Sequence, residues 1–226
     1  MFGRVLMRKP TNLTRELKHI GNVGSIRCSS SKYPISRYPI VDDGDVENMP
    51  EDIKQRMLDV KEKSTFLPNV FKTLAHRPDE FRSFFNYYDV LMEETSLLTK
   101  AEKEMIVVAT STINNCNYCL ASHGALLRIY SKNPLLGDQV AVNHQHADIT
   151  DRQKRMLDFA VLVAKGQPIS DEEFKNMRES GFSDQEIWDI GAIAAFFALS
   201  NRMAHLTNMR PNDEFYSLGR IPKDKK

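Results

Sequence analysis

The sequence predicts an all-α fold, an antiparallel helical bundle, from residue 46 onward. Apolar residues recur at helical spacing, and no run alternates as a strand does. Because the connections between the expected helices are short, neighbouring helices should pack antiparallel. Three capping boxes each precede a helical segment: they pair Thr99 with Glu102, Ser170 with Glu173, and Ser183 with Glu186.

Prolines mark where the first helices begin. Pro50 precedes a helical stripe of apolar residues, and Pro68 opens a short helix within residues 66–76. Pro78 opens a helix with a stripe of large side chains: Phe81, Phe84, Phe85, Tyr88 and Leu91. Such a stripe is typical of a hydrophobic core rather than of a cofactor site, so we assign it to the core.

Thr99 begins a very apolar helix, and residues 116–130 form the next one, which Pro134 ends. A helix capped by Thr150 ends before Gly166.

The Ser170 helix ends at Gly181, and the Ser183 helix follows. Between Ile190 and Leu199 this last helix is apolar nearly all round. We expect it to lie in the centre of the fold or against another subunit.

The composition is that of an ordinary globular protein. Of 226 residues, 41% are hydrophobic and 27% charged, which excludes collagen-like and wholly disordered classes. No apolar run approaches the roughly 18 residues that span a bilayer, so we expect no membrane insertion. The net charge of +1 argues against binding nucleic acid by bulk charge. Three cysteines are too few, and odd in number, for a disulfide scaffold.

The near-neutral total hides a strong asymmetry. Residues 1–41 hold eight basic residues and one acidic residue, a net charge of +7, which leaves −6 on the other 185 residues. The segment is also rich in Ser, and Leu13, Leu17 and Ile20 give it an apolar helical stripe. This composition is typical of a mitochondrial transit peptide. We therefore divide the chain into a leader with linker, residues 1–45, and one helical domain, residues 46–226, and expect the mitochondrial matrix as its location after cleavage near residues 27–30. The alternative is a basic arm that stays attached.

The chemistry is concentrated in one segment, in which Glu104 is followed by Cys116, Cys119 and His123. On a helix the last three share one face, and Cys119 and His123 are one turn apart, close enough for the imidazole to hold the thiol proton. Cys116 begins that helix, where free amides and the helix dipole stabilise a thiolate. Two such thiols and a base are what a thiol-redox catalyst needs. Glu104, polar in an apolar stretch, is placed to accept a proton from His123 or to orient its ring.

Other interpretations of these residues remain open. Cysteines and histidines also serve as buried structural residues. Cys116, Cys119 and His123 also supply three zinc ligands, with His144 or His146 as a fourth. A second CxxC or HxxxH pair is missing, which favours redox chemistry over a non-catalytic zinc-binding module.

The segment resembles the alkylhydroperoxidase D-like / carboxymuconolactone decarboxylase superfamily, whose redox branch has Glu, eleven residues, CxxC, three residues and His. The resemblance extends over residues 64–215 and favours the peroxidase-related subgroup. It rests on further short motifs: LPNVF at 67–71, AHRP at 75–78, tyrosines 87 and 88, SHGA at 122–125, RESGFSD at 178–184 and NRMA at 201–204.

The resemblance implies a helical fold that forms a homo-oligomer, often a trimer or hexamer. It implies a thiol peroxidase in which Cys119 attacks the hydroperoxide, Cys116 resolves the product, and His123 with Glu104 relays protons. Tyr118 stands where the bacterial alkylhydroperoxidase D proteins have His. The resemblance therefore carries over neither a proton-relay role for this position nor the identity of the reducing partner. Asn201 and Arg202 belong to the NRMA motif, and we interpret them as structural or pocket-lining residues.

From this we expect a peroxiredoxin-type enzyme that uses a hydroperoxide and a dithiol or protein reductant and needs no metal or organic cofactor. The decarboxylase branch generally lacks the cysteine pair, which disfavours a lyase of that type. The lyase stays an alternative beside the non-catalytic zinc-binding module.

Overall fold

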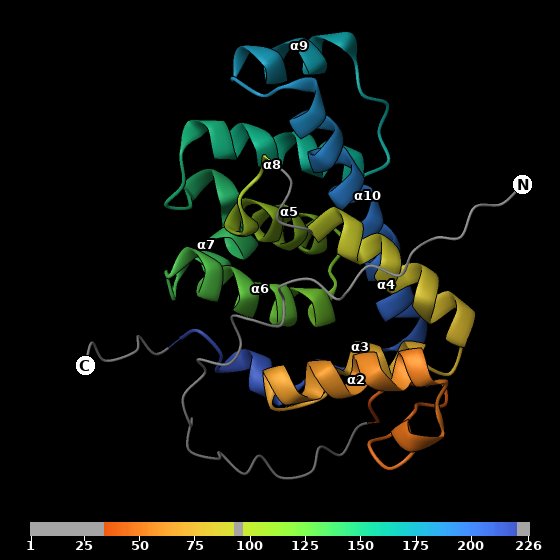
Figure 1. Ribbon diagram of the computed structural model, residues 1–226. Coiled ribbons are helices and arrows are strands. Elements are labelled where there is room, and N and C mark those ends of the chain that lie inside the picture. The colour runs from red at the N-terminus through yellow and green to blue at the C-terminus, as the bar shows by residue number, and fades with distance from the viewer. Residues whose placement is uncertain (1–33, 93–96, 221–226) are drawn as a thin grey trace, which may run out of the picture.

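The computed structural model describes residues 34–92 and 97–220. Over these ranges the regular structure is helical, without a strand, which confirms the predicted fold class (Figure 1). The expected leader helix and Cys28 lie outside the described residues. In chain order the α-helices are α2 (Glu51–Ser64), α3 (Asn69–Leu74), α4 (Pro78–Met92), α5 (Lys100–Ile113), α6 (Asn117–Ser131), α7 (Leu136–Asn143), α8 (Asp151–Ala164), α9 (Asp171–Glu179) and α10 (Asp184–Thr207).

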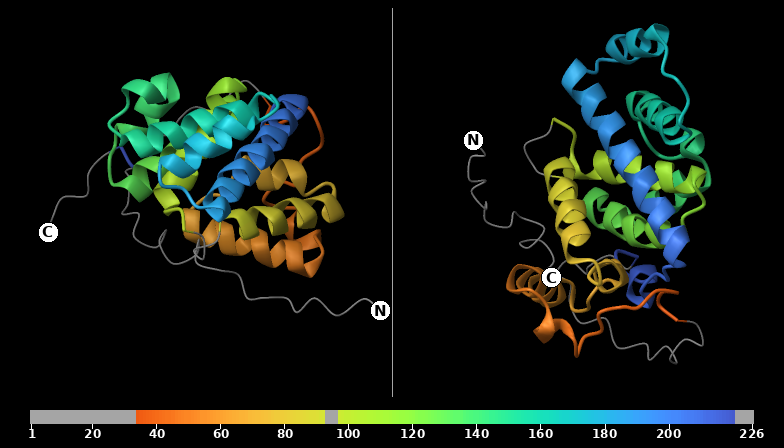
Figure 2. Two further views of the ribbon diagram at one scale, coloured as in Figure 1. Left: turned by 90° about the horizontal axis from the view of Figure 1, so that it is seen from above. Right: turned by 90° about the vertical axis from the view of Figure 1, so that its right-hand side faces the viewer.

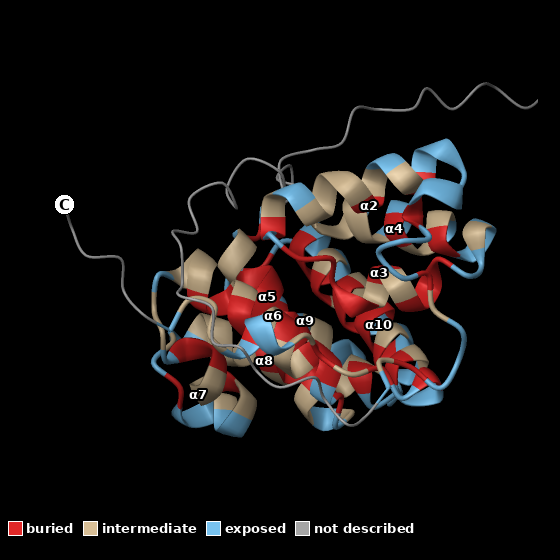
Figure 3. Cartoon of the chain, turned by 90° about the horizontal axis from the view of Figure 1, so that it is seen from below, coloured by how far each residue is buried: buried red, intermediate tan, exposed pale blue. Residues whose placement is uncertain are grey.

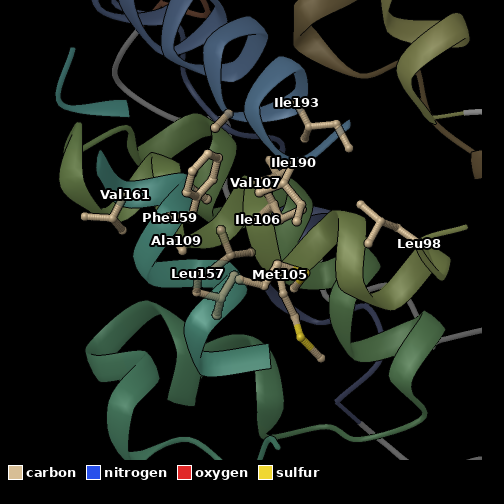
Figure 4. Close-up of a cluster of buried hydrophobic side chains, with 14 of the residues drawn as sticks. Leu98, Met105, Ile106, Val107, Ala109, Leu157, Phe159, Val161, Ile190 and Ile193 are labelled. Atoms are coloured by element: carbon tan, nitrogen blue, oxygen red, sulfur yellow. The ribbon is translucent and has the colours of Figure 1, made fainter. Parts of the chain in front are cut away.

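Helix α5 is the centre of the fold and packs against α6, α7, α8 and α10. Ile106, Val107 and Val108 are fully buried. They meet side chains of α8 and α10, among them Leu157 and Ile190 (Figure 4). At roughly 1.5–3 kcal/mol for each fully buried aliphatic side chain, this cluster contributes strongly to stability.

A second core joins α2, α3 and α4, beside the layer of α5 and α6 (Figure 2). Phe71 and Phe85 stack with ring centroids 4.3 Å apart, and Phe81 packs on both rings. The aromatic stripe of α4 thus belongs in part to the core, as predicted. Phe84 and Tyr88 of that stripe are only partly buried.

Two of the three predicted capping boxes are complete, those of Thr99 with Glu102 and of Ser183 with Glu186. Ser170 accepts a hydrogen bond from the amide of Glu173, but the return bond is not formed, and the Glu173 carboxylate binds Arg155 instead. The prediction of a full box was wrong there because a tertiary ion pair competes for the carboxylate.

The sequence analysis did not predict α7. Pro134 ends α6 as expected, but a new helix of eight residues begins directly afterwards. It packs closely on α6 because Gly137 faces the backbone of Gly124, where a Cβ on Gly137 would come within 2.7 Å of the Gly124 carbonyl oxygen. The helix is too short for a periodic pattern to reveal it.

The long helix α10 is central on one face only. Ile193 and Phe197 are buried, whereas Trp188 is 76% and Leu199 52% exposed. In Figure 3, buried residues gather where helices face one another, and exposed ones mark the outer surfaces.

Two chain segments outside the helices close around α6 and the ends of α10 and α3. The amide of Arg37 donates to the carbonyl of Thr207, and that of Val41 to Lys72. Residues 35–41, which we assigned to the leader and linker, therefore lie against the helical body. On the C-terminal side the buried guanidinium of Arg128 donates to the carbonyls of Phe215 and Leu218.

Within the described part of the chain, no helix is long and apolar enough to cross a membrane.

Candidate functional site

The link between α5 and α6 places Cys116 at the N-terminus of α6. Asn115 has a left-handed backbone (φ 53°), a conformation that asparagine tolerates better than most residues. Cys116 is the cap of α6, and its Sγ accepts a hydrogen bond from the amide of Cys119 at 3.5 Å. A sulfur at this position faces the positive end of the helix, which stabilises a thiolate.

Cys116 and Cys119 behave as one ionisable pair. Both are 1% exposed, and no disulfide joins them. The hydrogen bond from the Cys119 side chain, followed by that from the Cys119 amide, lowers the pKa of Cys116 to about 6 against the opposing effect of burial. The same sulfur contact and burial raise the pKa of Cys119. At neutral pH the pair therefore holds one proton, on Cys119, and one negative charge, on Cys116.

Glu104 and His123 form a hydrogen-bonded pair between α5 and α6. Nδ1 of His123 lies 2.7 Å from Oε2 of Glu104, which is 1% exposed. When Glu104 is ionised it accepts a hydrogen bond from the Nδ1–H of a neutral His123, which leaves the Nε2 lone pair available as a base. The edge of the imidazole contacts the ring of Phe197, with centroids 4.8 Å apart, which further fixes the ring.

A cavity adjoins the second cysteine. It holds about 990 Å³ of space free of protein atoms, counting its open mouth. Cys119 and His123 line it, whereas Cys116 does not. Aromatic side chains form a large part of the wall. They come from helices α3, α4, α6 and α10 and from the segments beside α3 and at the C-terminal side: Phe66, Phe71, Phe84, Phe85, Tyr88, Tyr118, Phe197 and Phe215.

The cavity partly corrects the assignment of the α4 stripe. Phe84, Phe85 and Tyr88 are core residues on one side and cavity wall on the other. The helical period places these rings on one face of α4 but does not show that the opposite partner is partly empty space.

The four predicted site residues therefore lie close together, as two separate contacting pairs. The cysteines contact each other, and His123 contacts Glu104. Among the described residues, no direct hydrogen bond joins the His123 ring to either sulfur. Cys119 and His123, one turn apart on α6, both line the cavity.

Helix α10 adds two polar residues whose contact with the cysteines the sequence analysis missed. Ser200 Oγ lies 4.0 Å from Cys119 Sγ and lines the cavity. Asn201 is fully buried and bonds Asn114 and Ser111. Its side chain adds to the lowering of the Cys116 pKa and opposes the larger rise of the Cys119 pKa. Ser200 stands 81 positions from Cys119, and no local pattern marks that contact.

Tyr118, between the cysteines, is turned toward α3. Its buried hydroxyl accepts a hydrogen bond from the amide of Val70 at 3.1 Å, and burial raises its pKa. The side chain therefore fastens α6 to α3.

Arg202, next to Asn201, is exposed and donates to the carbonyl of Ala198.

The zinc interpretation finds no geometric support. His144 and His146 lie in the 3-10 turn after α7, where His144 bonds Asp158 at 2.9 Å. In the described part of the chain, no three His, Cys, Asp or Glu side chains converge in a way that could hold a metal ion.

Comparisons with known proteins place this site in a family. The Carboxymuconolactone decarboxylase family matches residues 78–134. No curated protein matches the chain significantly.

Solved structures cover the whole helical body. An uncharacterized peroxidase-related protein from Ralstonia eutropha JMP134, described as an alkylhydroperoxidase AhpD core, is 57% identical with a TM-score of 0.81 over 84% of this chain and 100% of its own. A peroxidase-related protein from Silicibacter sp. TM1040 is 34% identical, with a TM-score of 0.76 over 85% of this chain and 100% of its own.

The debrominase Bmp8, solved with 2,3,4-tribromopyrrole, has a TM-score of 0.64 over 84% of this chain and 97% of its own. At 16% identity this likeness concerns the fold alone. The identity and coverage of the two peroxidase-related structures show that the chain belongs to the alkylhydroperoxidase D-like / carboxymuconolactone decarboxylase superfamily.

Proposed function

We propose that the protein is a thiol peroxidase that reduces hydroperoxides through Cys119 and Cys116. The observation that carries the proposal is the position of the pair: Cys119 lines an apolar cavity together with His123, and Cys116 lies behind it within reach of its sulfur. Members of the peroxidase-related subgroup at 57% and 34% identity support the same general activity.

Access and charge assign different roles to the two sulfurs. A hydroperoxide in the cavity reaches Cys119 and not Cys116, so Cys119 is the attacking sulfur. Because Cys119 carries the proton of the pair, a base must remove it first. We assign this to Nε2 of His123, which Glu104 orients through Nδ1.

The proposed cycle balances as follows. The Cys119 thiolate attacks the outer oxygen of ROOH, the O–O bond breaks, and the alkoxide takes a proton from His123 to leave as ROH. The product is a sulfenic acid on Cys119. The Cys116 thiolate attacks that sulfur to form the disulfide, the S–O bond breaks, and the departing hydroxide takes a proton from solvent to leave as water. An external dithiol or protein reductant then restores both thiols, so the cycle uses no metal and no organic cofactor.

Intact mass tests this cycle. Hydroperoxide should lower the mass by about 2 Da as the disulfide closes, and a dithiol should restore it. Cys116→Ser should stop at a sulfenic acid, about 16 Da heavier, because no resolving thiol remains. Cys119→Ser should not react. Full hydroperoxide turnover by Cys119→Ser would contradict the proposal. Zinc bound at one ion per chain in the parent protein and lost in Cys116→Ser would favour the metal-binding alternative. Enzymatic activity that needs His123 but neither cysteine would favour the lyase.

The ionisation of the pair gives a second prediction, best measured in a Cys28→Ser background. Thiolate absorbance should rise with pH around a midpoint of about 6, since Cys116 loses its proton there. Cys119→Ala should move the midpoint upward, because the Cys119 hydrogen bond is the largest cause of the low pKa. Cys116→Ala, the matched variant, should have no transition near this midpoint. A midpoint that Cys119→Ala leaves unchanged contradicts this account.

We also propose a homo-oligomer, a trimer or hexamer, built through the outer face of α10. That face carries Trp188, Ala192, Ala195, Leu199 and Leu206. The first four are spaced by four, three and four residues, and Arg202 interrupts the stripe before Leu206. Trp188, Leu199 and Leu206 are each more than half exposed, and an apolar stripe of this kind fits a second copy.

Light scattering should therefore show that Leu199→Glu lowers the subunit count. Val142→Glu serves as the control, because Val142 is 85% exposed on α7, away from this face. A monomeric parent protein, or an equal effect of both variants, counts against the interface.

We propose import into the mitochondrial matrix on the basis of the leader. Residues 1–45 fused to a fluorescent protein should direct it to mitochondria, with cleavage before residue 35 so that the contacts of residues 35–41 survive. A matched fusion with the basic residues of the leader changed to Gln should stay in the cytosol. A cytosolic parent fusion would refute the import proposal.

A further inference from the structure

The last two turns of α10 hold the link between α5 and α6 that carries Cys116. The side-chain amide of Asn114 donates a hydrogen bond to Oδ1 of Asn201 at 3.0 Å, and Nδ2 of Asn201 donates to Ser111 Oγ at 3.0 Å. One turn later, Nε2 of His205 donates to the carbonyl oxygen of Asn114 at 2.8 Å. Asn114 is thus bound by α10 through both its side chain and its backbone.

The same face of α10 borders the Cys116 sulfur. Positions 201, 204 and 205 share one helix face, because they are three and four residues apart. Ala204 packs in one buried cluster with Cys116, and so does Met209, which follows the end of the helix. The backbone of Cys116 is fixed as well, since its amide donates to the carbonyl of Ser111 at 2.9 Å. α10 therefore sets both the path of the link and the surroundings of the sulfur.

The ionisation of Cys116 depends on groups from both α6 and α10. The hydrogen bond from the Cys119 side chain is the largest cause of the lowered Cys116 pKa, and burial opposes it. The Cys119 amide follows, then the charge of His205 and then the side chain of Asn201. A protonated His205 thus adds a positive charge beside a sulfur that α6 already favours as a thiolate.

Other titratable side chains around the link are neutral or are bonded elsewhere. Tyr118 of α6 stays protonated, because burial raises its pKa. Arg202, one turn before His205, is exposed and donates to a backbone carbonyl of its own helix. Arg210, beyond the end of α10, pairs with Asp213 at 2.8 Å. His205 is therefore the α10 side chain whose charge acts on this sulfur.

The strongest support of the Cys116 thiolate disappears at the step that needs it. In the proposed cycle the Cys119 thiol becomes a sulfenic acid, whose sulfur carries no hydrogen to donate. The Cys116 thiolate then attacks this sulfur: the S–S bond forms, the S–O bond breaks, and hydroxide leaves as water with a proton from solvent. At this step the thiolate depends on the Cys119 amide and on the two α10 residues, His205 and Asn201.

We propose that His205 is a positioning residue for the resolving cysteine. It fixes the link through the carbonyl of Asn114 and, in its protonated form, holds Cys116 as the thiolate that closes the disulfide. Asn201 supports the same link from inside the helical body. The role in disulfide closure rests on the proposed peroxidase function, whereas the role in the ionisation of Cys116 does not.

Thiolate absorbance of the reduced protein in the Cys28→Ser background tests the charge. His205→Gln keeps a donor for Asn114 but removes the charge, so the midpoint of Cys116 should rise by roughly 0.5 on the pH scale. His205→Lys keeps a positive charge and should leave the midpoint at about 6. The difference between the parent protein and His205→Gln should shrink in about 1 M salt, because salt screens an exposed charge.

His76→Gln is the matched control. His76 is also exposed, and its ring also bonds a backbone carbonyl, that of Thr73 at 2.6 Å, but it lies outside the cluster around Cys116. His76→Gln should leave the midpoint unchanged. An unchanged midpoint in His205→Gln overturns the proposal, and so does a rise that His76→Gln or His205→Lys reproduces.

The Cys119→Ala background imitates the loss of the thiol hydrogen at Cys119. His205→Gln should raise the midpoint of Cys116 in this background too, because the contribution of His205 does not depend on that hydrogen. A midpoint that His205→Gln leaves unchanged here contradicts a role at the resolving step.

The rate of disulfide closure tests the same role during the reaction. After an excess of hydroperoxide, quenched samples are weighed for loss of the sulfenic acid. Closure should be about threefold slower in His205→Gln at about pH 5.5, since a rise of roughly 0.5 in the midpoint lowers the thiolate fraction by that factor. At about pH 9 both proteins hold the full thiolate and should close equally fast. An equal loss of rate at both pH values indicates a purely structural role and refutes the proposal.

The two measurements separate this inference from the proposed function. A midpoint that responds to His205 in a protein that hydroperoxide does not convert to the disulfide would refute the function and keep the role of His205 in ionisation. Disulfide closure that proceeds identically in the parent protein and in His205→Gln, with an unchanged midpoint, would keep the function and refute the inference.

Discussion

The structure depends on a carboxylate placed in the middle of its most buried helix. Glu104 lies on α5 among fully buried aliphatic residues, and burying an ionised carboxylate is costly unless it is hydrogen-bonded. His123 of α6 provides that bond at 2.7 Å. The requirement fixes the rotation of α6 against α5, because only one face of α6 carries the imidazole. Cys119, one turn before His123, is thereby directed to the same side as the cavity.

The rotation of α6 also gives the two cysteines different environments. Cys116 is held at the helix N-terminus by the amide of Cys119, in an environment that favours a thiolate, whereas Cys119 is the sulfur beside the cavity. The sulfur with the lower pKa is therefore not the sulfur that meets a ligand. This division suits a reaction in which one sulfur attacks and the other waits as an ionised resolving group.

The fold alone leaves the chemistry open, since a debrominase shares it at 16% identity. What distinguishes one member from another is the lining of the cavity and the groups along it. Here the lining comes from α2, α3, α4, α6 and α10 and from segments outside these helices that are distant in sequence, such as Phe66 and Phe215, whose ring centroids lie 5.1 Å apart. The charge of Arg56 is cancelled by Asp89 on the neighbouring helix.

The sequence by itself determined the helical class, most helix ends and the grouping of four candidate site residues, because caps, helical periods and the CxxC spacing are local properties. It could not reveal α7, whose eight residues are too few for a recognisable helical pattern. Nor could it show that the Glu173 carboxylate binds Arg155 instead of returning a hydrogen bond to Ser170. Only the tertiary structure decided which cysteine borders the cavity and brought Ser200 to Cys119 and Arg56 to the wall. Ser200 and Arg56 stand 81 and 63 positions from Cys119 in the sequence, and their place around one cavity follows from packing, which no local pattern encodes.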